Sequence, residues 1–233
     1  MSLTTVFKRL AVGLFLALAL SHAQFVEATY PEKSLRLIAP FAPGGGTDQM
    51  SRALGAGLSK VLGQTVVIEN KPGAGTVIGM DLVARSAPDG YTLVLATFAH
   101  AVNSTLQSKL PYDSDQAFAP VALIARGPNV LVVRAESSFQ TVKEIVAAAK
   151  TQPGKLTYAS QGNGTSAHLA GEMLQNLGKI ELTHIPYRGA SLALTDLLGG
   201  QVDLFIGTAA GVSPLVASGK LRAIAVTLSL IHI

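Results

Sequence analysis

Two glycine-rich loops combine residue types and spacing that suit anion binding. We name them the first glycine loop, Pro40–Asp48, and the second glycine loop, Ser160–His168. Backbone N–H groups at the start of a helix lack an intrahelical partner, and the helix dipole adds partial positive charge there. Glycine leaves this backbone uncovered, so a carboxylate or phosphate can approach it closely. Two such loops on successive strand–helix units predict a small anion bound from both sides.

The candidate ligand contacts are backbone N–H groups and hydroxyls in the two loops, together with residues at the ends of other strands. Parallel α/β sheets bind ligands beyond the carboxyl ends of their strands, where Thr97, Phe98, Tyr187 and Gly189 are expected. The ligand-binding residues predicted from the sequence are Phe41, Gly44, Gly45, Gly46, Thr47, Asp48, Thr97, Phe98, Ser160, Gly162, Asn163, Gly164, Thr165, His168, Tyr187, Gly189 and Asp203.

Several of these positions have a structural alternative. The run Gly44–Gly46 fits either a tight turn or a binding loop, and three consecutive glycines favour binding. Asp48 stabilises a helix start at least as readily as it contacts a ligand, because a carboxylate repels an anion. Phe41 either lines the ligand site or packs, and His168 either donates to a carboxylate or is buried structurally. For Asp203, at the start of a strand, a structural role is slightly favoured.

Strands and helices alternate around the loops. The expected strands are 34–39, 65–69, 91–96, 156–159, 182–186, 202–206 and 221–227. The expected helices contain 47–62, 77–83, 142–152, 169–177 and 192–198. Thr47 is expected to N-cap the first helix, and Thr141–Glu144 has the spacing of a capping box. The alternation predicts parallel sheets covered by helices on both faces, with a domain boundary near Gly127–Pro128.

Composition excludes several classes of protein. Hydrophobic residues make up 48% and charged residues 14% of the chain, which favours a globular fold over disorder. The formal net charge is +4 with no basic run, so we expect no nucleic-acid partner. The chain contains no cysteine, which excludes thiol catalysis and cysteine-based metal sites. We expect a monomer with no cofactor and no metal.

The first 28 residues have the pattern of a cleaved signal peptide. Lys8 and Arg9 form a basic region, and Leu10–Leu20 is apolar. Small residues allow cleavage after Ala23 or Ala28. The apolar run is shorter than the roughly 20 residues that a membrane span needs, which favours export over an uncleaved anchor. We therefore expect a periplasmic protein.

A nucleotide-dependent enzyme that uses the loop Gly162–Gly164 is the alternative function. Residues 162–167 fit the dinucleotide pattern G-x-G-x-x-A, and Glu181 lies roughly 20 residues further on. However, Glu181 falls at the beginning of the next strand, whereas a ribose-binding acid belongs at its end. The sequence has no G-x-S-x-G elbow, Walker A loop or His-rich metal spacing. A non-enzymatic binding protein is therefore favoured, and a purely structural module would not require two glycine loops.

An ordered series of short motifs resembles one protein family. The motifs are Tyr30-Pro31-Glu32-Lys33, Pro-Phe-x-Pro-Gly-Gly-x-x-Asp at 40–48, Glu69-Asn70-Lys71-Pro72-Gly73-Ala74-Gly75, Pro88-Asp89-Gly90-Tyr91-Thr92-Leu93, Leu110-Pro111-Tyr112-Asp113, Ser-x-Gly-x-Gly-Thr-x-x-His at 160–168, Pro186-Tyr187-Arg188-Gly189, Gly200-Gln201-Val202-Asp203 and Gly219-Lys220-Leu221-Arg222-Ala223. Together with the signal peptide they resemble the Bug family, the periplasmic solute-binding proteins of tripartite tricarboxylate transporters. The resemblance runs from about Tyr30 to Thr227.

The resemblance implies a type II periplasmic-binding-protein fold, with two α/β domains around a ligand cleft. Bug proteins bind small organic carboxylates and present them to the membrane subunits of the transporter. By the same resemblance, the first glycine loop holds one end of the ligand, often through water. The second glycine loop holds a carboxylate with backbone and hydroxyl donors.

The end of the chain departs from the family pattern. After Thr227 the family continues through a Pro-rich segment and returns to the first domain, whereas this sequence ends with Leu228–Ile233. We therefore expect a chain truncated at its C-terminus, whose first domain lacks its return segment. The expected divisions are a signal peptide at 1–28, a first α/β domain at 29–127, a second at 128–227 and an atypical tail at 228–233.

Overall fold

The computed structural model describes residues 30–227 of the chain. The expected signal peptide and the atypical tail at 228–233 lie outside these residues. The chain divides into two compact units, residues 1–32 and 33–233, and every described helix and strand belongs to the second unit.

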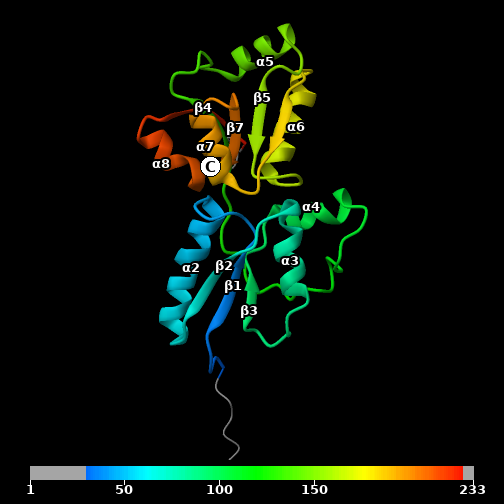
Figure 1. Ribbon diagram of the computed structural model, residues 1–233, viewed down its shortest axis with the longest axis vertical. Coiled ribbons are helices and arrows are strands. Elements are labelled where there is room, and N and C mark those ends of the chain that lie inside the picture. Colours follow the sequence, from blue (N-terminus) through cyan, green and yellow to red (C-terminus); the bar gives the residue numbers. More distant parts are fainter. Residues whose placement is uncertain (1–29, 228–233) are drawn as a thin grey trace, which may run out of the picture. The chain divides into compact units, whose positions relative to one another are not determined.

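The first sheet is parallel, as predicted. Its region consists of β1 (Leu35–Ala39), α2 (Gly46–Leu62), β2 (Val66–Asn70), the 3-10 turn η1 (Ala74–Thr76), α3 (Val77–Ala84), β3 (Thr92–Val94) and α4 (Phe98–Leu106). The strand order is β2-β1-β3. Leu35 lies opposite Val66 and Arg36 lies opposite Thr92. Figure 1 shows α2 alongside β1 and β2, against which it packs.

Three strands of the second sheet, β6-β5-β7, repeat the order of the first sheet, in which the earliest strand lies between the next two. Its region consists of β4 (Asn129–Arg134), α5 (Val142–Thr151), β5 (Thr157–Ser160), α6 (Ser166–Gly178), β6 (Thr183–Pro186), α7 (Ala190–Leu198), β7 (Leu204–Thr208), α8 (Ala209–Ala217) and β8 (Leu221–Val226). The strand order is β6-β5-β7-β4-β8, with β5 parallel to both β6 and β7. The two sheets lie on either side of Gly127–Pro128 in the sequence, and the domain limits 29–127 and 128–227 stay a prediction.

The expectation of purely parallel sheets was wrong for the second sheet. Strand β4 runs antiparallel to both β7 and β8. A parallel neighbour requires a crossover connection, usually a helix, between the paired strands. The chain runs from β4 to these two partners through further strands and several helices rather than through one crossover helix, so the connection does not impose a parallel direction.

Strand β4 is buried on both faces. Val130 and Val132 pack in one core cluster, and Leu131 and Val133 pack in the other. Because successive side chains of a strand point to opposite faces, both faces of the sheet are apolar here. A strand covered on both faces needs the continuous apolar run that the sequence shows at 130–133.

The first helix begins two residues earlier than an N-cap at Thr47 implies. Helix α2 starts at Gly46 with Gly45 as its N-cap, and no side chain caps it, so the expectation of an N-cap at Thr47 was wrong. The Asp48 carboxylate reaches back to the Gly44 N–H and closes the turn before Gly46, which fixes the earlier start. By contrast, the capping box predicted at Thr141–Glu144 is present at the start of α5.

Candidate functional site

A cavity of about 200 Å³ lies where the carboxyl ends of several strands meet. Open α/β sheets bind ligands at this edge. The lining residues follow β1, β2, β5 and β6, with one addition after α4. They are Pro40, Phe41, Gly73, Ala74, Gly75, Thr76, Gln107, Gln161, Gly162, Asn163, Pro186, Tyr187 and Arg188.

The two glycine loops contribute unequally to this cavity. Phe41 lines it and is only 5% exposed, but Gly44–Gly46 are not among the lining residues. Gly45 and Gly46 instead pack against the second-sheet region. A Cβ at Gly45 would lie 3.3 Å from the Cβ of Ala190, and a Cβ at Gly46 would lie 2.6 Å from Thr208 Oγ1. These two glycines therefore permit a close approach between elements, and only the second glycine loop presents its glycine backbone to the cavity.

Asp48 stabilises the first glycine loop from within. Its carboxylate accepts hydrogen bonds from the Gly44 N–H at 2.9 Å, from Asn70 Nδ2 at 2.9 Å and from Arg52 Nε at 3.0 Å. Burial alone raises the pKa of Asp48, but the hydrogen bonds from Arg52, Gly44 and Asn70 outweigh it, so the pKa lies below its usual value. The structure thus places Asp48 as the anchor of the loop, with its neighbour Thr47 half-buried on α2.

A turn after β2 lines the cavity, although it was not among the predicted site residues. In this glycine turn, Gly73–Thr76, all four residues have positive φ. Gly75 lies so close to the Asn163 carbonyl oxygen that a Cβ would overlap with it. Asn103 on α4 donates to the Gly75 carbonyl at 2.8 Å and supports the turn from behind. The sequence signal was present, because Gly73 and Gly75 follow a strand just as the other glycines do.

The hydroxyls of the second glycine loop bond within the loop. Ser160 is fully buried, and its Oγ accepts the Gly162 N–H at 3.1 Å. Thr165 is the N-cap of α6, and its Oγ1 donates to the Gly162 carbonyl at 2.7 Å. The N–H and the carbonyl of Gly162 are therefore both held by side chains of the loop. Gly162 and Asn163 line the cavity.

A column of stacked rings lies behind the second glycine loop. The ring of His184 lies 4.6 Å from that of Tyr158 and 4.4 Å from that of His168. Ser160 Oγ lies 2.7 Å from His184 Nε2, and the Gly164 N–H donates to His168 Nδ1 at 3.3 Å. Burial and the neighbouring His168 lower the pKa of His184 to about 4, so its ring is neutral at pH 7. His184 was missed in the sequence, where it is an isolated histidine within a strand.

Tyr187 lines the cavity and Gly189 shapes its surroundings. The Tyr187 hydroxyl donates to Asp196 at 2.5 Å. Burial, together with this carboxylate, raises the pKa of Tyr187 to about 12, so the hydroxyl stays protonated at pH 7. Gly189 has a φ of 157°, and a Cβ there would lie 2.9 Å from the Ala42 nitrogen. The Ala42 N–H donates to the Arg188 carbonyl at 3.0 Å, which joins the two regions beside the cavity.

Thr97, Phe98 and Asp203 are also outside the cavity lining. Thr97 is the N-cap of α4, and Phe98 begins that helix with 54% of its surface exposed. Asp203 precedes β7, and its carboxylate accepts the N–H and the hydroxyl of Thr157 at 2.8 and 2.9 Å. Because Thr157 begins β5, Asp203 lies at the opposite edge of the sheet from the cavity. The structural role favoured for Asp203 fits this position.

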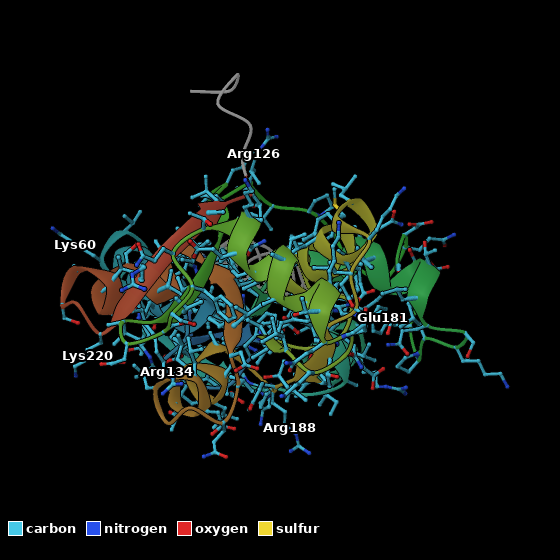
Figure 2. All side chains as sticks on the ribbon, turned by 90° about the horizontal axis from the view of Figure 1, so that it is seen from above. Lys60, Arg126, Arg134, Glu181, Arg188 and Lys220 are labelled. Carbon is cyan, nitrogen blue, oxygen red and sulfur yellow. The ribbon has the colours of Figure 1, made fainter. Side chains whose placement is uncertain are left out.

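The described residues that line the cavity offer hydrogen-bond donors and no carboxylate. Within residues 30–227, no protein acceptor takes the backbone N–H groups of Gln161, Asn163 or Gly75. Arg188 is the one charged residue in this lining. Its exposed side chain points outward from the ribbon in Figure 2, so its guanidinium adds positive potential near the cavity without enclosing it. This surface is suited to a small anion.

The described part of the chain has neither a candidate metal centre nor a candidate membrane span. Residues 30–227 contain no group of three His, Asp or Glu side chains placed to hold a metal ion. No described helix combines the length and the apolar character that crossing a bilayer requires.

Comparison with known proteins gives one consistent family. Residues 50–229 match the family described as the tripartite tricarboxylate transporter family receptor. Protein BugT of Bordetella pertussis is 38% identical over 92% of this chain and 67% of its own length. Among solved structures, the periplasmic binding protein BugD has a TM-score of 0.80 at 36% identity, covering 86% of this chain and 67% of BugD. The R. palustris protein Rpa4515, solved with adipate, has a TM-score of 0.83 at 34% identity, covering 86% and 67%.

These similarities confirm the periplasmic-binding-protein fold and the resemblance to the Bug proteins that the motifs indicated. The chain spans about two thirds of the length of the curated relatives that it matches.

Proposed function

Since this chain belongs to the tripartite tricarboxylate transporter receptor family, we propose that it is a periplasmic solute-binding protein for a small organic carboxylate. It delivers this ligand to the membrane subunits of its transporter. One observation supports the proposal above the others. Among the described residues, the lining of the cavity at the strand ends has free backbone N–H groups and no acidic side chain.

The size of the cavity favours a metabolite-sized ligand. Pockets for drug-sized molecules measure about 300–1,000 Å³. The cavity here, at about 200 Å³, suits a smaller molecule. Adipate in Rpa4515 is a ligand of this class, bound by a protein of the same fold. For this chain we propose the same chemical class.

The alternative nucleotide-dependent enzyme finds less support at the second glycine loop. The N–H groups of Gly162 and Gly164 already donate to Ser160 and to His168. A dinucleotide fingerprint needs its glycine backbone free for the pyrophosphate. Glu181 lies just before the amino end of β6, whereas a ribose-binding acid lies at the carboxyl end of its strand. We therefore propose a binding protein without catalytic activity.

The test is a ligand panel read by thermal unfolding and calorimetry. The panel contains malate, adipate and citrate as carboxylates, NAD and ATP as nucleotides, and adipamide as an uncharged analogue of adipate. Ligand at 100 times its Kd stabilises the folded state by about 2.7 kcal/mol. We expect stabilisation by at least one carboxylate and none by adipamide or the nucleotides. Stabilisation by a nucleotide alone would overturn the proposal.

A pair of matched glycine variants locates the site. Gly162 and Gly154 both have positive φ, so alanine is strained at either position. A Cβ at Gly162 would meet the Tyr187 carbonyl at 3.0 Å beside the cavity, whereas a Cβ at Gly154 meets nothing within 4 Å. We expect Gly162→Ala to weaken carboxylate binding about tenfold or more, which corresponds to about 1.4 kcal/mol. Gly154→Ala is expected to retain the affinity, and equal affinities in both variants would place the ligand elsewhere.

A further inference from the structure

The backbone N–H groups of the second glycine loop fall into two sets. The N–H groups of Gly162 and Gly164 donate to side chains behind the loop. The N–H groups of Gln161 and Asn163, which line the cavity, have no protein acceptor among the described residues. N–H groups that bond to the protein therefore alternate with free N–H groups along the loop. The side chains behind the loop determine which N–H groups stay free for a ligand.

Two histidines support the bonded N–H groups of Gly162 and Gly164. His168 Nδ1 accepts the Gly164 N–H directly at 3.3 Å. His184 acts through Ser160, whose Oγ lies 2.7 Å from Nε2 and accepts the Gly162 N–H at 3.1 Å. With Nε2 unprotonated, the serine hydroxyl donates to it and keeps its lone pairs for the glycine.

The stack fixes the position of both rings. His184 lies between the rings of Tyr158 and His168. The Tyr158 hydroxyl donates to Glu172 at 2.7 Å, and His168 Nε2 lies 3.7 Å from the same carboxylate. Neither imidazole can turn without breaking a ring contact or a hydrogen bond of the loop.

We propose that His168 and His184 are positioning residues that select which backbone N–H groups of the second glycine loop meet the ligand. The inference rests on the proposed function, because it concerns the same site. It assigns both histidines to the support of the loop rather than to ligand contact.

The Gly164 hydrogen bond needs an acceptor at His168 Nδ1. With a proton on Nδ1 this acceptor would become a donor that faces the Gly164 N–H, and the bond would be lost. Helix α4, which packs against Gly164, places the uncharged Leu106 there.

His184 supports the loop through a different contact from His168. Burial and the neighbouring His168 lower the pKa of His184 to about 4, so its ring is neutral at pH 7. The two histidines are separable by experiment, because His168 bonds to Gly164 and His184 acts on Gly162 through Ser160.

The binding experiment uses paired variants of the full chain, titrated with adipate and with malate by calorimetry at pH 7.5. Asparagine places an oxygen near the position of Nδ1, and glutamine places one near that of Nε2. We expect His168→Leu and His184→Leu to weaken binding about tenfold, while His168→Asn and His184→Gln restore most of the affinity.

A second measurement needs no ligand. In ¹H–¹⁵N spectra the Gly164 amide resonance is expected to move in His168→Leu and to stay near its wild-type position in His168→Asn. The Gly162 amide resonance is expected to respond in the same way to His184→Leu and His184→Gln. Leucine variants that fold and bind as tightly as the wild type, or amide resonances that do not respond to the loss of the acceptor, would overturn the inference. If no carboxylate binds the wild type, the proposed function fails, and the amide spectra still test both histidines.

Discussion

The polar side chains near the cavity mostly bind the protein itself. Asp48 accepts from the first glycine loop, and Ser160 and Thr165 accept from and donate to the second. Free backbone N–H groups in the cavity lining therefore remain as donors for a ligand. A backbone donor keeps its position only when the residues around it are fixed, which explains why so many side chains are used for support.

Asp48 provides the first prediction at this scale. Asp48→Ala removes the acceptor of the Gly44 N–H and of Asn70 Nδ2, both of which bond to a carboxylate that is only 4% exposed. Each buried donor left without its partner costs about 1–3 kcal/mol, so we expect a loss of this size in urea unfolding. Arg52→Ala is the control, since this exposed partner is worth about 0–1 kcal/mol. Equal losses in the two variants would contradict the anchoring role of Asp48.

His184 provides the second prediction. Its pKa is lowered from 6.5 to about 4 in the folded protein. Between these two values the unfolded chain binds a proton that the folded chain does not, so stability falls as the pH decreases through this window. We expect the wild type to lose unfolding free energy relative to His184→Gln from about pH 6.5 to 4. Urea unfolding at several pH values measures the difference, and parallel curves would contradict it.

At the scale of elements, one helix contains glycines with opposite functions. Gly46 and Gly57 both belong to α2. A Cβ at Gly46 would lie 2.6 Å from Thr208 Oγ1 and 3.1 Å from the Gly211 nitrogen, whereas a Cβ at Gly57 would meet nothing within 4 Å. Gly46 lets the start of α2 approach the start of α8. Gly57 lies in the middle of the helix on its exposed side, where no neighbouring element requires a glycine.

The two alanine variants should therefore differ in sign. We expect Gly46→Ala to lose about 1–3 kcal/mol of unfolding free energy through overpacking and to bind carboxylates more weakly. Gly57→Ala is expected to gain roughly 0.5–1 kcal/mol, because alanine loses less backbone entropy in a helix. Thermal unfolding and calorimetry on both variants provide the test. A stabilised Gly46→Ala with unchanged affinity would show that the two elements need not approach so closely.

Strand–helix units with clear start and stop residues could be predicted from the sequence. Strand β1, the end of α2 at Gly63 and the capping box of α5 all follow from local signals. Helices α4 and α8 could not be predicted in this way. Helix α8 contains Gly211 and Pro214, which usually interrupt helices, and tertiary packing of the buried Val212 outweighs them.

For the cavity, the sequence identified the loops better than the roles of their residues. Phe41 lies in the lining with Gly162, Asn163 and Tyr187, as the strand-end rule indicates. Whether a serine hydroxyl faces a ligand or a histidine depends on the residue that stacks behind it, here His184 from another strand. Such contacts between distant residues have no signal in local spacing.

At the scale of the whole molecule, export connects the N-terminal sequence with the proposed role. A carboxylate receptor for a membrane transporter must reach the ligand outside the inner membrane, and the first 28 residues supply the required pattern. A monomer in the periplasm stays the prediction made from the sequence.

The corresponding prediction concerns the mature N-terminus. After expression in a Gram-negative host, we expect the periplasmic fraction to contain a protein that begins at Gln24 or Thr29. Intact mass spectrometry distinguishes the two cleavage points. A variant with Lys8 and Arg9 replaced by glutamine is the control, since loss of the basic region should reduce export. Retention of Met1 in the membrane fraction of the wild type would contradict the prediction.

The position of β4 has a consequence for the order in which the protein folds. All strands of the first sheet lie between Leu35 and Val94, so this sheet can form soon after its residues leave the ribosome. Strand β4 must wait for both neighbours, and Asn129 finally bonds to Thr227, 98 positions later. Pairings at such sequence separation slow folding and leave an apolar strand open to aggregation while it waits. The antiparallel strand that begins the second sheet is therefore exposed to aggregation until β7 and β8 have been synthesised.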